Sequence, residues 1–338
     1  MAAAISYEVR APQWVFTYQG VDISADVSPM VRAIRYVDRL DNESGELEVE
    51  LEDHAKRWQR AWYPALGDQV GARIGYRGEG LLNCGDFQID ELELDGPPDV
   101  MRVRCLAASV TPAMRTPNSA AYENQSLVAI AASIAAKYGL ELIAAPQVGE
   151  GGEGDIAFAR VTQRSETDLE FLKRLANRYD FDFTVRGGQL VFYARTALEA
   201  APAVRTIVRA DTERVAFRNR TRRIYGGAQV SYFSPQSKRL ISQTVTAPSP
   251  TGDTVKIVER VENSQQAVAR ADAALKLHNM VFVEAAIEGP GIPVAVSGNV
   301  FQLSGWGAFD GRYLIDTARH RIDRATGYTT AYSARRLG

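Results

Sequence analysis

The sequence has few of the residues from which catalytic and metal sites are usually built. Its 338 residues include only two cysteines and three histidines. Two cysteines, Cys84 and Cys105, are too few for a disulfide scaffold, which indicates a reducing compartment. His54, His278 and His320 are scattered, without the i, i+4 spacing of a helical zinc site, and no Cys-x-x-Cys motif occurs. The sequence therefore predicts no metal site and no cofactor site.

Long apolar runs are also missing. The most continuous one, residues 127–136, is far shorter than the ~20 residues that a membrane-spanning helix needs. The chain does not start with a basic segment followed by an apolar core, so no signal peptide is visible. We expect a soluble chain made in the cytoplasm, with no membrane partner.

The overall charge is balanced but unevenly distributed. The 39 basic and 41 acidic residues leave a net charge of -2. Residues 1–100 hold 19 acids and 9 bases, whereas the rest of the chain carries an excess of bases. Such an asymmetry suits contacts between copies of the chain or with an oppositely charged partner.

The first 112 residues predict antiparallel β-structure. The clearest strand is residues 46–52, where apolar and acidic residues alternate without exception. Period two places Leu47, Val49 and Leu51 on the core face and the four glutamates on the other. In residues 81–94 the apolar residues change from odd to even positions at Asp90-Glu91, as a β-bulge would cause. Short strands separated by turns favour a first β-barrel domain over residues 1–112.

Residues 113–200 predict an α/β domain. A helix with apolar residues at helical spacing begins after Ser126, its expected N-cap, and stops at Gly139. A second helix opens near Ser165-Glu166-Thr167-Asp168, close to a capping box. Each helix runs directly into a strand, and the second strand continues into a hairpin.

Residues 201–338 predict strands again. Residues 222–233, 238–246 and 254–261 have extended character, and a helix begins at Asn263 or Ser264. We expect a second antiparallel β-barrel that carries this helix. The predicted fold class is therefore β-rich α+β, with two barrels of tail-tube or hub type, an intervening α/β domain, and some strands exchanged between the barrels.

One motif match has the wrong context. Residues 149–154 satisfy G-x-G-x-x-G, the dinucleotide-binding pattern. That motif requires a helix directly after it, whose N-terminus holds a pyrophosphate. A strand-like run, residues 155–159, follows instead, and the nearby acids would repel phosphates. We interpret the segment as a flexible loop.

Paired carboxylates raise the possibility of a glycosidase. The acids between Asp38 and Asp53 are abundant, but four of them lie in a row on one strand face: Glu46, Glu48, Glu50 and Glu52. A catalytic pair usually has one acid in an apolar pocket that raises its pKa. The row is better interpreted as a solvated or partner-facing surface, opposite Arg102 and Arg104. A cell-wall-degrading glycosidase remains an alternative.

A basic segment raises the possibility of nucleic-acid binding. Between Arg205 and Arg239 there are nine bases and two acids. Arg218, Arg220 and Arg222 occupy every second position of an extended segment, so their side chains lie on the same face. The outer face of an ordinary strand has the same pattern. Contact with an acidic protein surface is the more economical interpretation, and nucleic acid stays an unlikely alternative.

Three stretches resemble one known family. Residues 127–142 resemble the L-x-x-I-A-x-x-I-A-x-x-Y-G-L segment of the phage late control D family, the baseplate hub proteins of contractile tails. Residues 163–176 are similar to its Q-x-x-E-S/T-D-x-x-F-L-x-R-L-A helix. Residues 309–315, with 318–320 and 327–330, are similar to its F-D-G-x-Y-x-I … H … G-Y-T-T pattern. The matches follow the family's order, while the first 110 residues match mainly in strand character.

The resemblance implies a structural protein without catalytic residues. It implies a homotrimeric hub whose two barrels per chain form a pseudo-sixfold ring, joining a threefold central spike to the sixfold tail tube and starting tube assembly. Other baseplate proteins are implied partners. The chain lacks a long β-repeat needle, so we expect a hub whose spike is a separate chain. The resemblance places it in a tail baseplate or injection-system particle assembled in the bacterial cytoplasm. A phage, a headless tail bacteriocin and another injection system all remain possible.

The resemblance gives the shared residues structural roles. Gly311 would permit a tight turn, and His320 would be a strand-face residue with a local hydrogen bond. Trp306 and Phe309 lie in a glycine-broken loop and are candidates for a partner surface. They are equally candidates for loop anchors packed on their own barrel.

Overall fold

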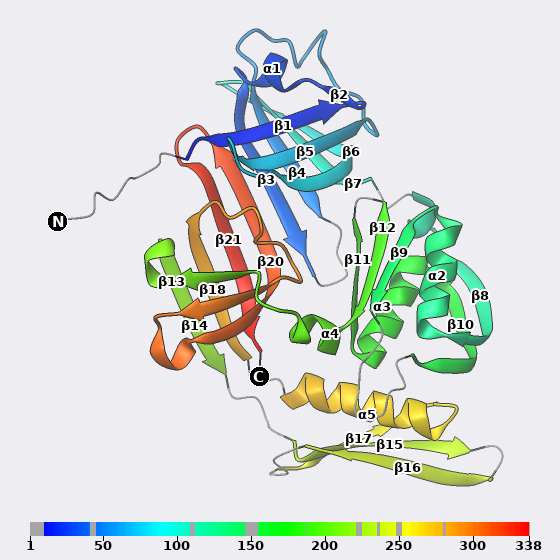
Figure 1. Cartoon of the computed structure of the whole chain (residues 1–338). Helices are drawn as coiled ribbons and strands as arrows, with labels where there is room; N and C mark the ends of the chain where they lie inside the picture. Colours follow the sequence, from blue (N-terminus) through cyan, green and yellow to red (C-terminus); the bar gives the residue numbers. More distant parts are fainter. Residues whose placement is uncertain are drawn as a thin grey trace.

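One long sheet contains strands from both ends of the chain (Figure 1). The computed structural model describes residues 10–40, 45–108, 112–145, 155–186, 188–220, 225–234, 237–247, 252–279 and 282–337. The order of the long sheet is β14-β18-β21-β20-β3-β4-β7-β6-β5-β1-β2, with β19 paired to β20 and β13 paired to β19. Three smaller sheets complete the described strands.

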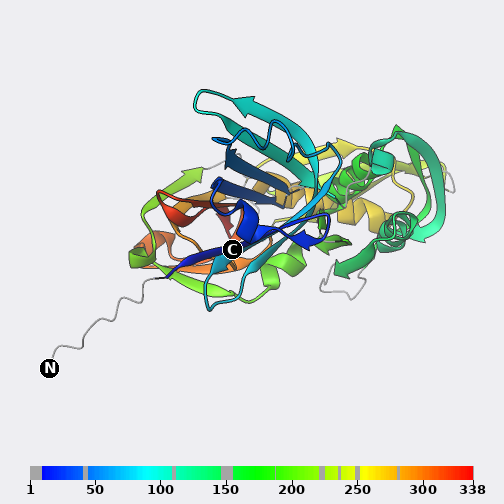
Figure 2. The ribbon, with the colours of Figure 1, turned by 90° about the horizontal axis from the view of Figure 1, so that it is seen from above.

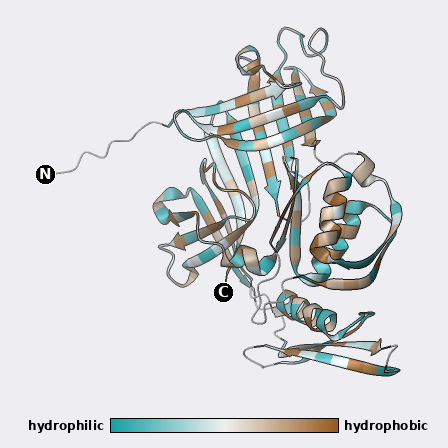
Figure 3. Ribbon diagram, turned by 45° about the vertical axis from the view of Figure 1, so that its right-hand side comes forward, coloured by the Kyte–Doolittle hydropathy of each residue, from teal (hydrophilic) through white to brown (hydrophobic). Residues whose placement is uncertain are grey.

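The N-terminal part of the long sheet is antiparallel throughout. It contains β1 (Pro12–Tyr18), β2 (Val21–Asp22), β3 (Val31–Arg39), β4 (Glu46–Glu52), β5 (Gln69–Tyr76), β6 (Leu82–Asp95) and β7 (Val100–Ala107), with the short helix α1 (Ser24–Val27). Polar and apolar residues alternate along these strands (Figure 3). Leu47, Val49 and Leu51 are buried, as the alternation predicts. The pairing of β6 with β7 shifts between Ile89 and Glu91, which confirms the predicted bulge.

The C-terminal part of the long sheet has its own hydrophobic core. Its elements are β13 (Arg205–Val208), η2 (Arg209–Asp211), β14 (Arg214–Arg220), β18 (Phe282–Pro290), β19 (Val300–Ser304), η3 (Gly307–Phe309), β20 (Gly311–Asp323) and β21 (Gly327–Arg336). Phe301, Tyr313 and Ile315 are fully buried in this core. Gly311 has a φ of 146° at the start of β20, a conformation that favours glycine.

The hairpin of β20 and β21 connects the two cores. The first residues of β20 pair with β19, and its residues from Thr317 onward pair with β3. In the pairing of β20 with β21, a register shift between Ile315 and Thr317 separates these two halves of β20. Near the tip of the hairpin, Ile322 and Tyr328 pack in the core of β1–β7. The last strands of the chain therefore complete the core of its first strands.

The middle of the chain forms an α/β region beside the long sheet (Figures 1 and 2). Its elements are η1 (Pro112–Arg115), β8 (Asn118–Ser126), α2 (Leu127–Lys137), β9 (Glu141–Ala145), β10 (Ala157–Glu166), α3 (Asp168–Tyr179), β11 (Phe181–Arg186), β12 (Gln189–Ala194) and α4 (Arg195–Ala200). The strands form a β11-β12-β9 sheet and a separate β10-β8 pair. Both predicted helices are confirmed. Residues 118–126, directly before the first helix, form β8, which pairs with β10.

Local capping explains where the two helices begin. The Ser126 hydroxyl accepts a hydrogen bond from the Ala129 N–H, as the sequence predicts for α2. At α3, Thr167 and Glu170 form a reciprocal capping box. The G-x-G-x-x-G segment, residues 149–154, lies outside the described residues, and residues 157–159 of the strand-like run after it belong to β10.

The strands that follow residue 225 form a separate sheet with a helix on it. They do not join the second barrel, contrary to the expectation from the sequence. The strands β15 (Gly227–Ser234), β16 (Arg239–Thr246) and β17 (Thr254–Val258) were expected in the second barrel. They instead form their own sheet, in the order β16-β15-β17, under helix α5 (Ser264–Asn279). The buried residues Ala228, Val230 and Tyr232 of β15 pack with Ala267, Ala271 and Leu275 of α5 and not with the long sheet. Alternation reveals a strand but not which sheet it joins.

Candidate interaction surfaces

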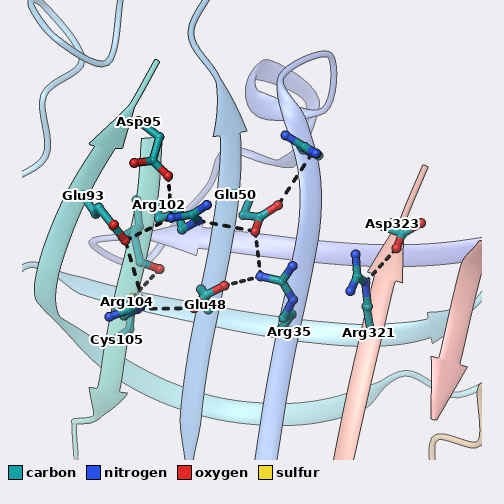
Figure 4. A network of polar contacts seen from close by, with 12 residues as sticks. Arg35, Glu48, Glu50, Glu93, Asp95, Arg102, Arg104, Cys105, Arg321 and Asp323 are labelled. Carbon is teal, nitrogen blue, oxygen red and sulfur yellow. Dashed lines mark hydrogen bonds and ion pairs between the residues drawn. The ribbon is translucent and has the colours of Figure 1, made fainter. Parts of the chain in front are cut away.

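The glutamates of β4 belong to a network of ion pairs on one face of the long sheet, which we call the charged face (Figure 4). It consists of Arg35, Glu48, Glu50, Glu91, Glu93, Asp95, Arg102 and Arg104. Arg102 lies 3.6 Å from Glu50 and 2.6 Å from Asp95, while Arg104 lies 3.3 Å from Glu48. The predicted position of the two arginines opposite the glutamate row is therefore confirmed.

Glu50 is the most buried member of the charged face, with 7% of its surface exposed. Burial on its own would raise the pKa of Glu50, but the hydrogen bond from Arg35 and the charges of Arg32 and Arg102 outweigh it. The net result is a pKa below the usual glutamate range. A glycosidase acid needs the opposite shift.

The two ends of the glutamate row are more accessible. Glu46 is paired with Arg39 at 2.9 Å. Glu52 lies 3.1 Å from Arg324 in the turn of the β20–β21 hairpin. All four glutamates of the row thus have basic neighbours within the chain, and their contact with a partner stays a prediction.

Trp306 and Phe309 pack on their own sheet. Both side chains are half-buried against Phe217 of β14, whose ring is stacked on Phe309 with 4.7 Å between centroids. The ring of Trp306 meets Phe217 at 5.8 Å in a T-shaped arrangement. Their packing matches the loop-anchor interpretation, and their exposed parts keep a partner contact as a prediction.

The basic segment does not form one strip. Arg218 is exposed on β14, which ends at Arg220, and Arg222 lies outside the described residues. Arg205 belongs to β13 in the long sheet, whereas Arg239 belongs to β16 in the small sheet under α5. The fold divides the cluster that the sequence presents as continuous.

His320 is buried on β20 and is held by hydrogen bonds at both ring nitrogens. Its ring nitrogens lie 2.8 Å from the Tyr328 hydroxyl and 2.9 Å from the Ala295 carbonyl oxygen, and its ring stacks on Tyr36. Because the carbonyl can only accept, the ring is satisfied as a neutral imidazole with Nε2–H donating. Burial lowers the pKa of His320 to about 4. The expected local hydrogen bond is confirmed.

A polar cluster around Asp168 was not predicted from the sequence. The buried Asp168 carboxylate accepts hydrogen bonds from Lys137 (2.6 Å), Tyr138 (2.5 Å), Gln163 (2.7 Å) and Asn118 (3.0 Å). These contacts hold its pKa at about 2, although burial on its own would raise it. The cluster joins β8, α2, β10 and α3. In the sequence, the only indication of this cluster was that Gln163 and Asp168 are both positions of the family motif over residues 163–176.

An apolar pocket of about 350 Å³ was also not predicted. It is lined by residues of the N-terminal sheet, of α1 and of the loop between β4 and β5, which contains Trp58, Trp62 and Tyr63. The sequence signal was a cluster of three aromatic residues between two strands.

The residues that the structure describes contain no group of three or more histidine, cysteine or acidic side chains placed to hold a metal ion. None of their helices is long and apolar enough to cross a membrane. Cys84 and Cys105 are buried free thiols, and burial raises the pKa of both.

Comparison with known proteins agrees with the sequence motifs. The model of the phage tail baseplate hub family (GPD) matches residues 104–326. A probable baseplate hub protein of Escherichia phage 186 is 26% identical over 240 residues, which cover 70% of this chain and 60% of that protein. The chain thus spans less than two thirds of this relative's length.

Solved structures share the fold at low identity. The 43 kDa tail protein of prophage MuSo2 from Shewanella oneidensis has a TM-score of 0.69 at 17% identity, covering 97% of this chain and 99% of that one. An Escherichia coli component of the type VI secretion system, described as similar to T4 bacteriophage tail proteins, has a TM-score of 0.54 at 15% identity, covering 90% and 73%. With most of its length matched by the family model, the chain belongs to the phage tail baseplate hub family.

Proposed function

We propose that the chain is a structural hub that assembles as a trimeric ring of pseudo-sixfold symmetry. One observation carries the proposal: the long sheet encloses two separate hydrophobic cores, one around β1–β7 and one around β13, β14 and β18–β21. Three copies would bring six such units around one axis. A ring with both symmetries can join a threefold spike to a sixfold tube.

The partners follow from the same geometry. We propose that one side of the ring binds the central spike and the other side binds the tail tube or its initiator, so that the hub starts tube assembly. The family match and the fold shared with a type VI secretion component support this arrangement. Other baseplate proteins would contact the outer surface. The ring would assemble in the bacterial cytoplasm, within a phage tail or a related injection particle.

Two other functions have less support. The alternative of a cell-wall glycosidase would need an acid of raised pKa beside the glutamate row, and Glu50 has a lowered pKa. The alternative of nucleic-acid binding would need a continuous basic surface, and the segment from Arg205 to Arg239 is divided between two sheets.

Electron microscopy of the purified chain tests the proposal. Class averages viewed along the ring axis should contain six barrel densities in threefold-related pairs. Rings with a different number of densities, or particles with one copy in every class, would contradict it.

A further inference from the structure

A groove with a volume of about 610 Å³ lies between the α/β region and the start of α5, and we call it the arginine groove. Two of its arginines come from β10, two from α3 and one from the segment before α5. Glu262 is the only acid that lines the groove. The fold thus gathers five guanidinium groups from three separate segments: Arg160, Arg164, Arg174, Arg178 and Arg260.

The floor of the arginine groove is apolar and firmly packed. Phe158, Leu175 and Tyr179 line it, and each is at most 5% exposed. The rings of Phe158 and Tyr179 meet at 5.5 Å, and the guanidinium of Arg178 lies over the Tyr179 ring at 5.6 Å. These floor residues belong to the core of the α/β region. The strand and the helix that carry four of the arginines are therefore preorganised, which reduces the entropy lost when a partner binds.

The one acid in the groove already has its hydrogen bonds. The Glu262 carboxylate accepts from the backbone N–H groups of Ala159 at 2.6 Å and Arg160 at 2.8 Å, and from Gln266 Nε2 at 3.2 Å. Within the described part of the chain, it forms no ion pair with an arginine of the groove. Glu262 therefore shows that a carboxylate fits beside β10, and it leaves the guanidinium groups to other partners.

The arginines of the groove differ in what they contact. Three of them have an acidic partner in the chain, at 2.6–3.7 Å: Arg160 with Glu123, Arg174 with Glu166 and Arg178 with Glu259. The other two, Arg164 and Arg260, are exposed and form no ion pair with any residue that the structure describes. A carboxylate can accept two hydrogen bonds from one guanidinium group. These two arginines are therefore the positions at which an acidic occupant gains most.

The surrounding acids favour separate carboxylates over a chain of phosphates. Glu123, Glu166 and Glu259 lie beside three of the guanidinium groups and would repel a continuous row of negative charges. Acidic side chains that project one at a time from a polypeptide can avoid them. A second copy of the chain is a poor source of such side chains, because the acids of its charged face are paired with its own arginines.

We propose that the arginine groove binds an acidic segment of a different protein, whose carboxylates pair with Arg164 and Arg260 and whose apolar atoms cover the floor. This site is additional to the ring, and the partner's place among the baseplate proteins rests on the proposed function. The groove lies within one chain, so binding does not require the trimer.

The test measures the fluorescence anisotropy of labelled hexaglutamate with the full chain at low ionic strength. We expect saturable binding, and hexaglutamine of the same length should bind at least about tenfold more weakly. Arg164→Gln combined with Arg260→Gln should weaken hexaglutamate binding about tenfold, because two charge pairs are lost. Arg73→Gln combined with Arg77→Gln removes the same charge from exposed residues outside the groove and should leave the affinity within about twofold.

A charge-preserving variant locates the probe. In Arg164→Lys combined with Arg260→Lys, a carbodiimide can join the carboxylates of hexaglutamate to the new amines. We expect mass spectrometry to find the cross-links at positions 164 and 260.

Several results would overturn the inference. These are cross-links confined to the native lysines, or equal affinity in the wild type and the double glutamine variant. Tighter binding of hexathymidylate, with the same dependence on Arg164 and Arg260, would replace the acidic protein segment by nucleic acid. A trimer that fails to bind hexaglutamate refutes the arginine groove alone, whereas a monomer that binds it refutes the ring alone.

Discussion

At the residue scale, His320 shows how a motif residue can be structural. The resemblance implies a strand-face histidine with a local hydrogen bond, and the neighbours of His320 are Tyr36, Tyr328, Thr330 and a backbone carbonyl, all uncharged. They fix a neutral ring between the two cores. The sequence could suggest a strand-face histidine, but the burial that lowers its pKa depends on strands more than 200 residues away.

The buried imidazole predicts an acid-dependent loss of stability. The folded pKa of about 4 is below the ordinary value of 6.5, so the unfolded chain binds the proton more readily. Stability from this group is complete above pH 6.5 and falls as the pH decreases toward 4. The loss approaches about 3 kcal/mol at the lower limit. Urea unfolding at pH 7 and pH 4.5 measures it.

Matched variants separate His320 from the other titrating groups. In His320→Gln the pH-dependent loss should shrink by about 2 kcal/mol between the same two pH values. His54→Gln, which removes an exposed histidine, is the matched control. Identical pH dependence in the wild type and His320→Gln would contradict the assignment.

At the element scale, strand β4 has two distinct faces. One face is apolar and buried, and the other belongs to the charged face. The sequence predicts both faces of β4 and the arginines opposite them, because cross-strand pairs follow directly from period two. It does not predict that Glu50 is buried under three arginines, since Arg32 and Arg35 come from β3 and their register is set by the fold.

The position of each glutamate in the row predicts its contribution to stability. Glu50→Gln should lower the free energy of unfolding by about 1–3 kcal/mol, because three arginines lose the charge that they share. Glu46→Gln should change it by less than about 0.5 kcal/mol, since Glu46 is half exposed where it pairs with Arg39. Denaturant unfolding of the two variants checks this. Equal losses would contradict the difference in burial.

The sheet under α5 has one covered face and one exposed face. Tyr232 is 5% exposed and packs toward α5, while its neighbour Phe233 is 60% exposed on the outer face beside Leu240. Tyr232→Ser should therefore lower the free energy of unfolding by about 3 kcal/mol, and Phe233→Ser by less than about 1 kcal/mol. Thermal unfolding distinguishes them, and a larger loss for Phe233→Ser would show that the faces are reversed.

At the scale of the whole molecule, the sequence predicts elements better than connections. The helices α2, α3 and α5, the Ser126 cap and most strands were predicted from local sequence patterns. The capping box of α3 was expected at Ser165–Asp168 and is formed by Thr167 and Glu170. The pairing of β20 with β3 and the separate sheet of β15–β17 were not predicted, because each depends on contacts between distant segments. The same limit applies to the surfaces: the glutamate row was visible along one strand, whereas the apolar pocket of the N-terminal sheet is lined by side chains from six elements and a loop.

The assembly itself is tested most directly by the solution mass of the purified chain, measured by light scattering at several concentrations. One chain has a mass of 37.1 kDa. We predict a mass three times that of the chain, unchanged on dilution through the micromolar range. A mass equal to one chain at every concentration, or a stable dimer, would contradict the trimeric hub.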